Sequence, residues 1–187
     1  MDATDADRMQ RRAARILLVT GVPGVGKTTL LRRVAAQAQR KLGGFTTEEM
    51  RTQGQRVGFR IVPFDGPGRV MAHLDFRSRA RVGRYGVDVD AIDAVAETAL
   101  ALDPNIDVYL VDEIGKMECF SARFVAAMRR LLDSDKRLVA SIARKGTGFI
   151  AEVTRRHDVD LWEVTVANRD ALVDPILKWI AAAPEAR

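Results

Sequence analysis

Apolar positions along the chain fall into short runs typical of buried strands and longer stretches that repeat every three or four residues, as on one face of a helix. Residues 15–20 form the first short run, and residues 30–42 form the first helical stretch. Gly43 and Gly44 follow this stretch and predict the end of the helix, because glycine readily closes helices. Residues 45–50 then predict a second strand.

The pattern changes over residues 53–76. Residues 57–62 and 69–74 alternate apolar and polar side chains, and the Asp65-Gly66-Pro67-Gly68 sequence between them is typical of a turn. We therefore expect a β-hairpin that extends an otherwise parallel sheet in the antiparallel direction. Residues 77–89 show no clear period and predict a loop.

The second half of the chain alternates strand and helix patterns. Strands are predicted over residues 108–111, 137–142 and 161–166. Helices are predicted after the capping residues Asp90 and Ser121, over residues 148–155, and from Asp174-Pro175. This alternation favours an α/β fold, with a mainly parallel sheet covered by helices on both faces. We expect one domain over residues 15–181, between a flexible tail at residues 1–14 and a short tail at residues 182–187.

The most informative segment follows the first strand and reads G-x-x-x-x-G-K-[ST], the phosphate-binding P-loop pattern. A strand before it and a helix after it are the context that this motif requires. Glycines let the backbone N–H groups approach phosphate oxygens, and the start of the helix attracts the same anion. Lys27 is then expected to reach the outer phosphates, and the Thr28 hydroxyl to bind Mg²⁺. The predicted nucleotide-binding residues here are Gly21, Val22, Pro23, Gly24, Val25, Gly26, Lys27, Thr28 and Thr29.

A second motif follows the apolar run at residues 108–111. Asp112 and Glu113 come directly after it, at the carboxyl end of a predicted buried strand, where ligands bind in open α/β sheets. Asp112 is the candidate for the Mg²⁺ shell, through a water, since Mg²⁺ keeps several waters. Glu113 is the candidate to orient or deprotonate a water that attacks the γ-phosphorus.

Two further kinds of contact are expected, and the sequence leaves alternatives open for both. A cation should stabilise the transition state, as an arginine finger does; the candidates are Arg51, Arg56, Arg60, Arg84, Arg144 and Lys116. By analogy with related folds, the loop after the last strand contacts the base. Its residues Asn168 and Arg169 either contact a base edge or cap the helix that follows.

Composition limits the class of protein. The chain has 187 residues, of which 47% are hydrophobic and 29% charged, as in ordinary globular proteins. No apolar run approaches the roughly 20 residues of a membrane span, and the acidic residues 1–7 do not resemble a signal peptide. Cys119 is the single cysteine, which excludes an internal disulfide and fits a reducing compartment. We expect a cytoplasmic monomer without a membrane partner.

The positive net charge of the chain bears on whether the protein binds nucleic acid. The formal net charge is +5, but the arginines are scattered and interleaved with acids, so nucleic acid is not the expected partner. One local cluster, Arg77, Arg79, Arg81 and Arg84, either forms a solvated edge or faces phosphate.

These motifs together resemble the family of small P-loop nucleoside-triphosphatases of archaea, bacteria and animals. The matching segments are residues 21–30, 44–51 (GFTTEEMR), 54–59 (GQRVGF), 82–87, 112–118 (DEIGKME) and 166–170. The resemblance implies a P-loop NTPase fold of the RecA-like branch and Mg²⁺-dependent hydrolysis of several nucleoside triphosphates to the diphosphate and phosphate. It also implies that Glu113 is the water-activating carboxylate. Arg84 departs from the pattern, since a lysine or glutamine is expected there.

The leading hypothesis is therefore a Mg²⁺-dependent triphosphatase that accepts ATP, GTP, CTP and UTP. Its predicted catalytic residues are Glu113, Lys27, Arg84 and Lys116, with Thr28 and Asp112 at the metal. One alternative is a small-molecule or nucleotide kinase, with the cluster from Arg77 to Arg84 as a lid. Another is a nucleic-acid-stimulated ATPase, which the basic charge suggests.

Overall fold

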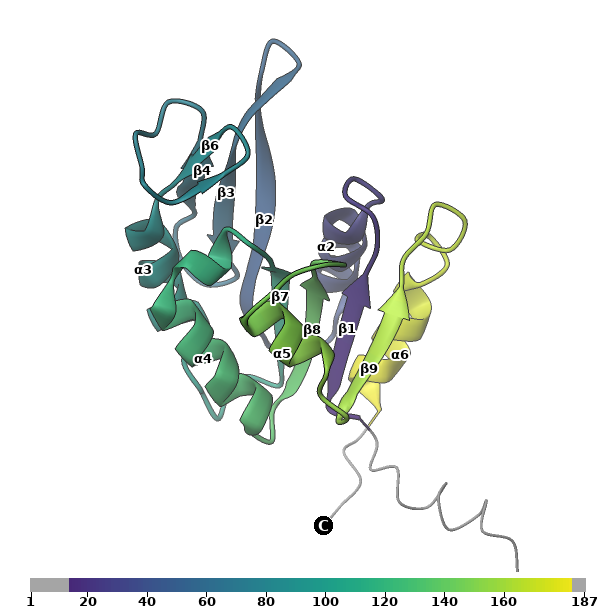
Figure 1. Ribbon diagram of the computed structural model, residues 1–187. Helices are drawn as coiled ribbons and strands as arrows, with labels where there is room; N and C mark the ends of the chain where they lie inside the picture. The colour runs from purple at the N-terminus through teal and green to yellow at the C-terminus, as the bar shows by residue number, and fades with distance from the viewer. Residues whose placement is uncertain (1–13, 183–187) are drawn as a thin grey trace, which may run out of the picture.

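A nine-stranded mixed sheet runs through the described part of the protein, residues 14–182 of a computed structural model (Figure 1). The strand order is β5-β6-β4-β3-β2-β7-β8-β1-β9. The strands are β1 (Ile16–Thr20), β2 (Leu42–Thr52), β3 (Gln55–Pro63), β4 (Arg69–His73), β5 (Arg81–Val82), β6 (Tyr85–Val87), β7 (Val108–Ile114), β8 (Arg137–Ile142) and β9 (Val159–Glu163). The tails predicted at residues 1–14 and 182–187 lie almost entirely outside the described residues.

Helices cover both faces of this sheet. They are α2 (Lys27–Gln37), α3 (Val89–Ala99), α4 (Ala122–Asp133), α5 (Phe149–Thr154) and α6 (Val173–Ala181), with a short 3₁₀ helix η1 (Glu118–Phe120). Residues of α2 and α6 pack on one face, and residues of α3, α4 and α5 pack on the other (Figure 1). The predicted α/β class, with a mainly parallel sheet between helices, is confirmed.

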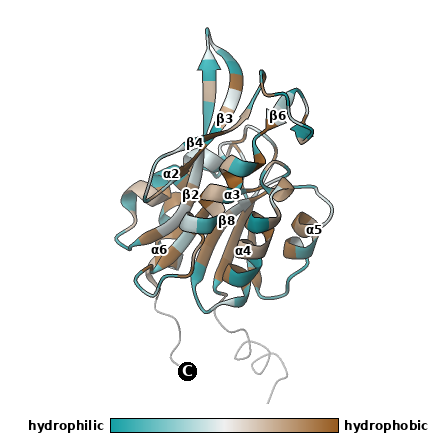
Figure 2. Ribbon diagram, turned by 90° about the vertical axis from the view of Figure 1, so that its left-hand side faces the viewer, coloured by the Kyte–Doolittle hydropathy of each residue, from teal (hydrophilic) through white to brown (hydrophobic). Residues whose placement is uncertain are grey.

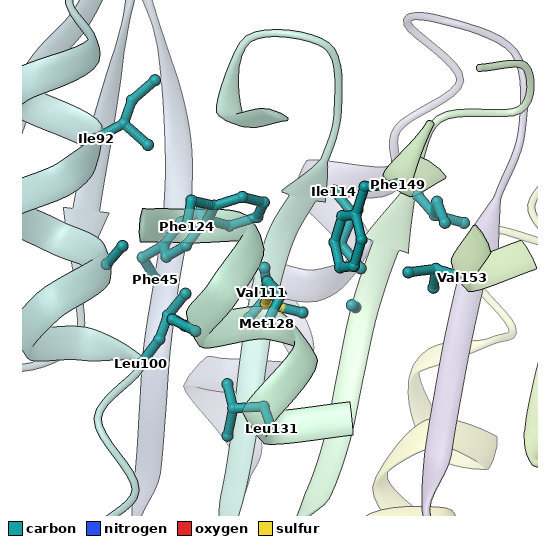
Figure 3. Close-up of a cluster of buried hydrophobic side chains, with 14 of the residues drawn as sticks. Phe45, Ile92, Leu100, Val111, Ile114, Phe124, Met128, Leu131, Phe149 and Val153 are labelled. Atoms are coloured by element: carbon teal, nitrogen blue, oxygen red, sulfur yellow. The ribbon is translucent and has the colours of Figure 1, made fainter. Parts of the chain in front are cut away.

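The two cores explain why the central strands are continuous apolar runs. Successive side chains of a strand point to opposite faces, so Ile16 and Leu18 of β1 join the core under α3, α4 and α5. Leu17 and Val19 join the core under α2 and α6. In the first core, Phe45 of β2 meets Phe124 of α4, with ring centroids 6.2 Å apart (Figure 3). A strand that is buried on both faces therefore cannot alternate apolar and polar residues.

The parallel part of the sheet sets the position of the predicted site. Strands β2, β7, β8, β1 and β9 pair in parallel, with β8 between β1 and β7. Their carboxyl ends therefore share one edge, which lies at the top of Figure 1. The P-loop after β1, the acidic pair at the end of β7 and the loop after β9 all lie at this edge.

The predicted antiparallel extension is confirmed. Strand β2 continues beyond its pairing with β7 and turns at Gln53 and Gly54, both with positive φ, into β3. Strand β4 then pairs antiparallel with β3, and the short β6 and β5 complete this side of the sheet. The β2–β3 tip projects past the P-loop end of the molecule (Figure 1).

The end of the first helix is a correction. Helix α2 ends at Gln37, and Leu42, Gly43 and Gly44 belong to β2 instead. Gly44 has φ 98°, and a Cβ there would lie 2.1 Å from the carbonyl oxygen of Leu110 on β7. The glycines therefore allow β2 to approach β7 closely, and they do not close the helix.

Other boundaries also differ from the prediction. The predicted loop at residues 77–89 contains β5 and β6, and α3 is capped by Asp88, whose carboxylate accepts from the Ala91 N–H at 3.0 Å. Strand β9 covers Val159–Glu163 because it pairs only with β1 and ends where β1 ends. Helix α6 begins one residue before Asp174. The predicted cap Ser121 and the predicted strand at residues 137–142 are confirmed.

Candidate nucleotide site at the carboxyl edge of the sheet

The P-loop joins β1 to α2 in the conformation that its glycines permit. Gly24 and Gly26 have φ 79° and 110°, in the left-handed region that favours glycine. A Cβ on Gly21 would lie 2.5 Å from the Val164 carbonyl oxygen, so a larger residue would disturb the entry to the loop. No side chain caps the first N–H groups of α2, which begins at Lys27. These N–H groups therefore suit an anion at the helix start.

Lys27 connects the P-loop to the acidic strand. Its side chain is only 9% exposed, and its ammonium lies 3.5 Å from the Gly21 carbonyl oxygen and 3.5 Å from Glu113 Oε2. The lysine thus points across the loop toward the end of β7. This position lets one charge contact both a phosphate on the loop and the neighbouring carboxylate.

Asp112 is fully buried between its neighbouring strands. Its Oδ1 accepts from the Ser141 hydroxyl of β8 at 2.6 Å, and its Oδ2 accepts from the Thr47 hydroxyl of β2 at 2.9 Å. Because hydroxyl donors already hold both oxygens, the carboxylate fits a metal ion held through water. Asp112 and the hydroxyl of Thr28, in the first turn of α2, are oxygen donors of the kind that Mg²⁺ prefers, and their role at a metal stays a prediction. Among the described residues, no group of three or more His, Cys, Asp or Glu side chains could hold a metal ion.

Thr47 and Ser141 were not identified from the sequence as site residues. Thr47 lies within a segment that carries the family resemblance, but its role depends on the pairing of β2 with β7. Ser141 gives one weak signal, as a polar residue inside the apolar run of β8.

Glu113 stands at the same strand end, with its side chain 32% exposed. Burial raises the pKa of this carboxyl above its ordinary value, and the charge of Asp112 raises it further, against the opposing effect of Lys27. A raised pKa makes the carboxylate a better proton acceptor near neutral pH. Partial exposure and a raised pKa suit the water-activating role predicted for Glu113, which stays a prediction.

The loop after β9 lies against the P-loop. The Arg169 guanidinium donates to the Val25 carbonyl oxygen at 3.1 Å, and its side chain lies over Gly26. Asn168 holds its own loop instead, because its amide accepts from the Thr165 N–H at 2.8 Å and donates to the Glu163 carbonyl oxygen at 2.9 Å. A cavity of about 220 Å³ adjoins this loop, lined by Gly26, Thr29, Leu30, Arg33, Arg169 and Asp170.

Comparison with known proteins shows which family this chain belongs to. The model of a family described as NTPase matches residues 16–177. The chain belongs to this NTPase family. The nucleoside-triphosphatase THEP1 of Thermotoga sp. (strain RQ2) is 38% identical over 162 residues, which cover 86% of this chain and 92% of that protein.

Two solved structures share the fold of this NTPase family member. The crystal structure of THEP1 from Aquifex aeolicus matches with a TM-score of 0.82 at 33% identity, over 89% of this chain and 99% of that one. The solution structure of a human cancer-related nucleoside triphosphatase matches with a TM-score of 0.75 at 32% identity, over 90% and 98%. The family and the P-loop NTPase fold that the sequence predicted are confirmed.

The two cations predicted to be catalytic lie in different settings within this NTPase. Arg84 is in the β5–β6 turn, where its guanidinium donates to the Arg56 carbonyl oxygen at 3.0 Å and stacks 5.4 Å from the centroid of the Tyr85 ring. Lys116 is exposed in the segment after β7. No described contact joins either side chain to the P-loop, so their role stays a prediction.

Glu118 is a residue of the site that the sequence did not single out. It is 4% exposed on η1, and burial together with the charge of Glu113 raises its pKa to about 8. A Cβ on Gly115 would lie 2.7 Å from Glu118 Oε2 and 3.0 Å from Glu113 Oε1. The missing side chain at Gly115 therefore gives room for two neighbouring carboxyl groups. The nearby Cys119 thiol also has a raised pKa, of about 12, which keeps it protonated and unreactive.

We expect the E118Q variant to lose part of the pH dependence of folding. The pKa of Glu118 is higher in the folded state than its usual value near 4.5. The neutral form therefore favours folding at low pH, and this contribution is lost as pH rises toward about 8. Between about pH 5 and 8, the unfolding free energy of the wild type should therefore fall with rising pH relative to that of the variant. Urea unfolding at several pH values measures this difference, and parallel curves for the two proteins would contradict the prediction.

Proposed function

We propose that this protein is a Mg²⁺-dependent nucleoside-triphosphatase that hydrolyses ATP, GTP, CTP and UTP to the diphosphate and phosphate. The contact between Lys27 and Glu113 carries the proposal, because it brings the P-loop and a partly exposed carboxylate within 3.5 Å. The same proximity would place a γ-phosphate on the loop next to the group that activates water. The printed names of the relatives support the same reaction class.

Each residue has a defined part in this reaction. The P-loop N–H groups and Lys27 bind the β- and γ-phosphates, and Thr28 and Asp112 would hold Mg²⁺, which neutralises phosphate charge when bound. Glu113 accepts a proton from a water whose oxygen forms a bond to the γ-phosphorus. The bond between this phosphorus and the β–γ bridging oxygen breaks, and the electron pair leaves with the diphosphate.

The loop after β9 supports broad base specificity. Asn168 uses both its amide oxygen and its amide nitrogen within its own loop, and Arg169 donates to the P-loop backbone. Few side-chain groups of this loop therefore remain to distinguish one base edge from another. A site that lacks dedicated hydrogen bonds to a base discriminates weakly between bases.

Phosphate release from the four triphosphates, with Mg²⁺ and with EDTA, tests the proposal. We expect release from all four without any added acceptor, within about tenfold of one another, and loss of release in EDTA. Tight nucleotide binding without release would overturn hydrolysis and favour the kinase alternative. Release that persists in EDTA would overturn the role of the metal.

We also propose that the protein acts as a cytoplasmic monomer. Every described helix is too short or too polar to cross a bilayer. The cytoplasmic part of the proposal is supported by the single cysteine of the chain, which fits a reducing compartment. Sedimentation analysis with and without nucleotide measures the oligomeric state. A nucleotide-dependent dimer would contradict the proposed monomer.

A further inference from the structure

The charge of the chain is concentrated in one part of the fold. Residues 51–84, here called the arginine extension, contain eight arginines, no lysine and only two acids, Asp65 and Asp75. These residues carry a formal charge of +6, whereas the whole chain carries +5. The remainder of the molecule therefore has a net charge of −1. The arginines that are scattered along the sequence are gathered in space by the antiparallel strands β3 to β6.

All eight arginines of this extension are exposed, and its β2–β3 tip and β6 segment project at one end of the molecule (Figure 2). Arg51 and Arg56 form ion pairs with Glu49. The others form no ion pair with any residue from 14 to 182: Arg60, Arg69, Arg77, Arg79, Arg81 and Arg84. Like charges at this density repel each other, and an anionic partner would relieve this repulsion.

The chemistry of the cluster favours phosphate. Arginine presents a planar fork of donors that matches phosphate oxygens. Lysine lacks this fork, and residues 51–84 contain no lysine. Aromatic rings hold some of these planes in place, since the Arg56 guanidinium lies 5.2 Å from the centroid of the Phe59 ring and the Arg84 guanidinium lies 5.4 Å from that of Tyr85. Guanidinium groups spread over several strands suit a partner with many phosphates.

We propose that the arginine extension is a sequence-independent binding surface for nucleic acid, which it contacts through the phosphate backbone. An anionic membrane is the less suitable partner, because Phe64 is the one large apolar residue of the extension that is exposed among the described residues, at 37%. Membrane-surface binding also needs buried apolar area. From the sequence alone the arginines are scattered along the chain, and nucleic acid is not the expected partner. This proposal differs from that expectation.

Two variants with the same change in charge test this surface. In the first, Arg69, Arg77, Arg79 and Arg81 are replaced by glutamine. In the matched control, four exposed cations outside the extension are replaced by glutamine: Arg130, Lys145, Arg155 and Lys178. The eight residues form no ion pair within the described part of the chain, so both variants should fold.

The measurement is fluorescence anisotropy of a labelled RNA or DNA strand of about 20 nucleotides, between about 50 and 200 mM salt. The wild type should bind with a steep salt dependence. The extension variant should bind at least about tenfold more weakly, with a log–log salt slope lower by about 3, whereas the control changes little. Both variants should hydrolyse triphosphate as the wild type does, which separates this surface from the proposed function. Equal weakening in both variants, flat wild-type binding, or binding to phosphatidylserine vesicles without binding to the strand would overturn the proposal.

Discussion

Replacing Glu113 by alanine is expected to keep nucleotide binding and to lower turnover by at least about a hundredfold, the scale of a lost general base. The side chain lies beside Lys27 and not in the P-loop, so its removal leaves the phosphate contacts in place. It removes the carboxylate that would take a proton from the attacking water. Phosphate release and equilibrium nucleotide binding, measured on the same preparation, separate the two effects.

The control is E152Q, which removes an exposed carboxylate of α5 that pairs with Arg129. We expect this control to retain wild-type turnover. E113Q should behave as the alanine variant does, because the amide keeps the shape of the carboxylate and loses its basicity. Full turnover in either Glu113 variant would remove this residue from its proposed role.

Replacing Lys27 by alanine is expected to weaken triphosphate binding by roughly tenfold to a hundredfold. A hydrogen bond to a charged group contributes about 1.5–3 kcal/mol, and about 1.4 kcal/mol corresponds to tenfold in affinity. Turnover should fall as well, because Lys27 would also neutralise charge on the phosphoryl group in the transition state. Titration of a fluorescent triphosphate analogue measures the change in affinity.

K178A is the matched control for this lysine, since Lys178 is an exposed cation on α6. Its affinity for triphosphate should equal that of the wild type. The loss in the Lys27 variant should be larger for a triphosphate than for the monophosphate, because the lysine is placed toward the outer phosphates. Equal losses for the two nucleotides would show that the variant disturbs the loop as a whole.

Short sequence patterns predicted the structure correctly where all the residues that determine it lie in one segment. The P-loop at residues 21–29 combines a glycine turn with a flanking strand and helix, and the structure places β1 and α2 on either side of it. The Ser121 cap and the strand at residues 137–142 are equally local. The position of Asp112 and Glu113 was also predictable, because both follow the apolar run of β7 and the end of a parallel strand lies at the carboxyl edge of the sheet.

Predictions from sequence patterns were wrong where the role of a residue depends on contacts with another strand. Gly43 and Gly44 read as a helix stop, although they allow β2 to approach Tyr109 and Leu110 of β7. The end of β9 was misplaced because that strand stops where its partner β1 stops. Neither constraint can be found within a window of neighbouring residues.

The sequence by itself determined the family, the α/β class and the phosphate-binding loop, because these depend on short motifs and on the periodicity of apolar side chains. Only the tertiary structure decided how Asp112 is held by Thr47 and Ser141, and how Glu118 comes beside Glu113 across Gly115. It also brought the arginines of residues 51–84 to one end of the sheet, where strands β3, β4, β6 and β5 lie side by side. The physical reason is that burial, pKa and charge density arise from groups that meet in space, and strand pairing brings them together from distant parts of the chain.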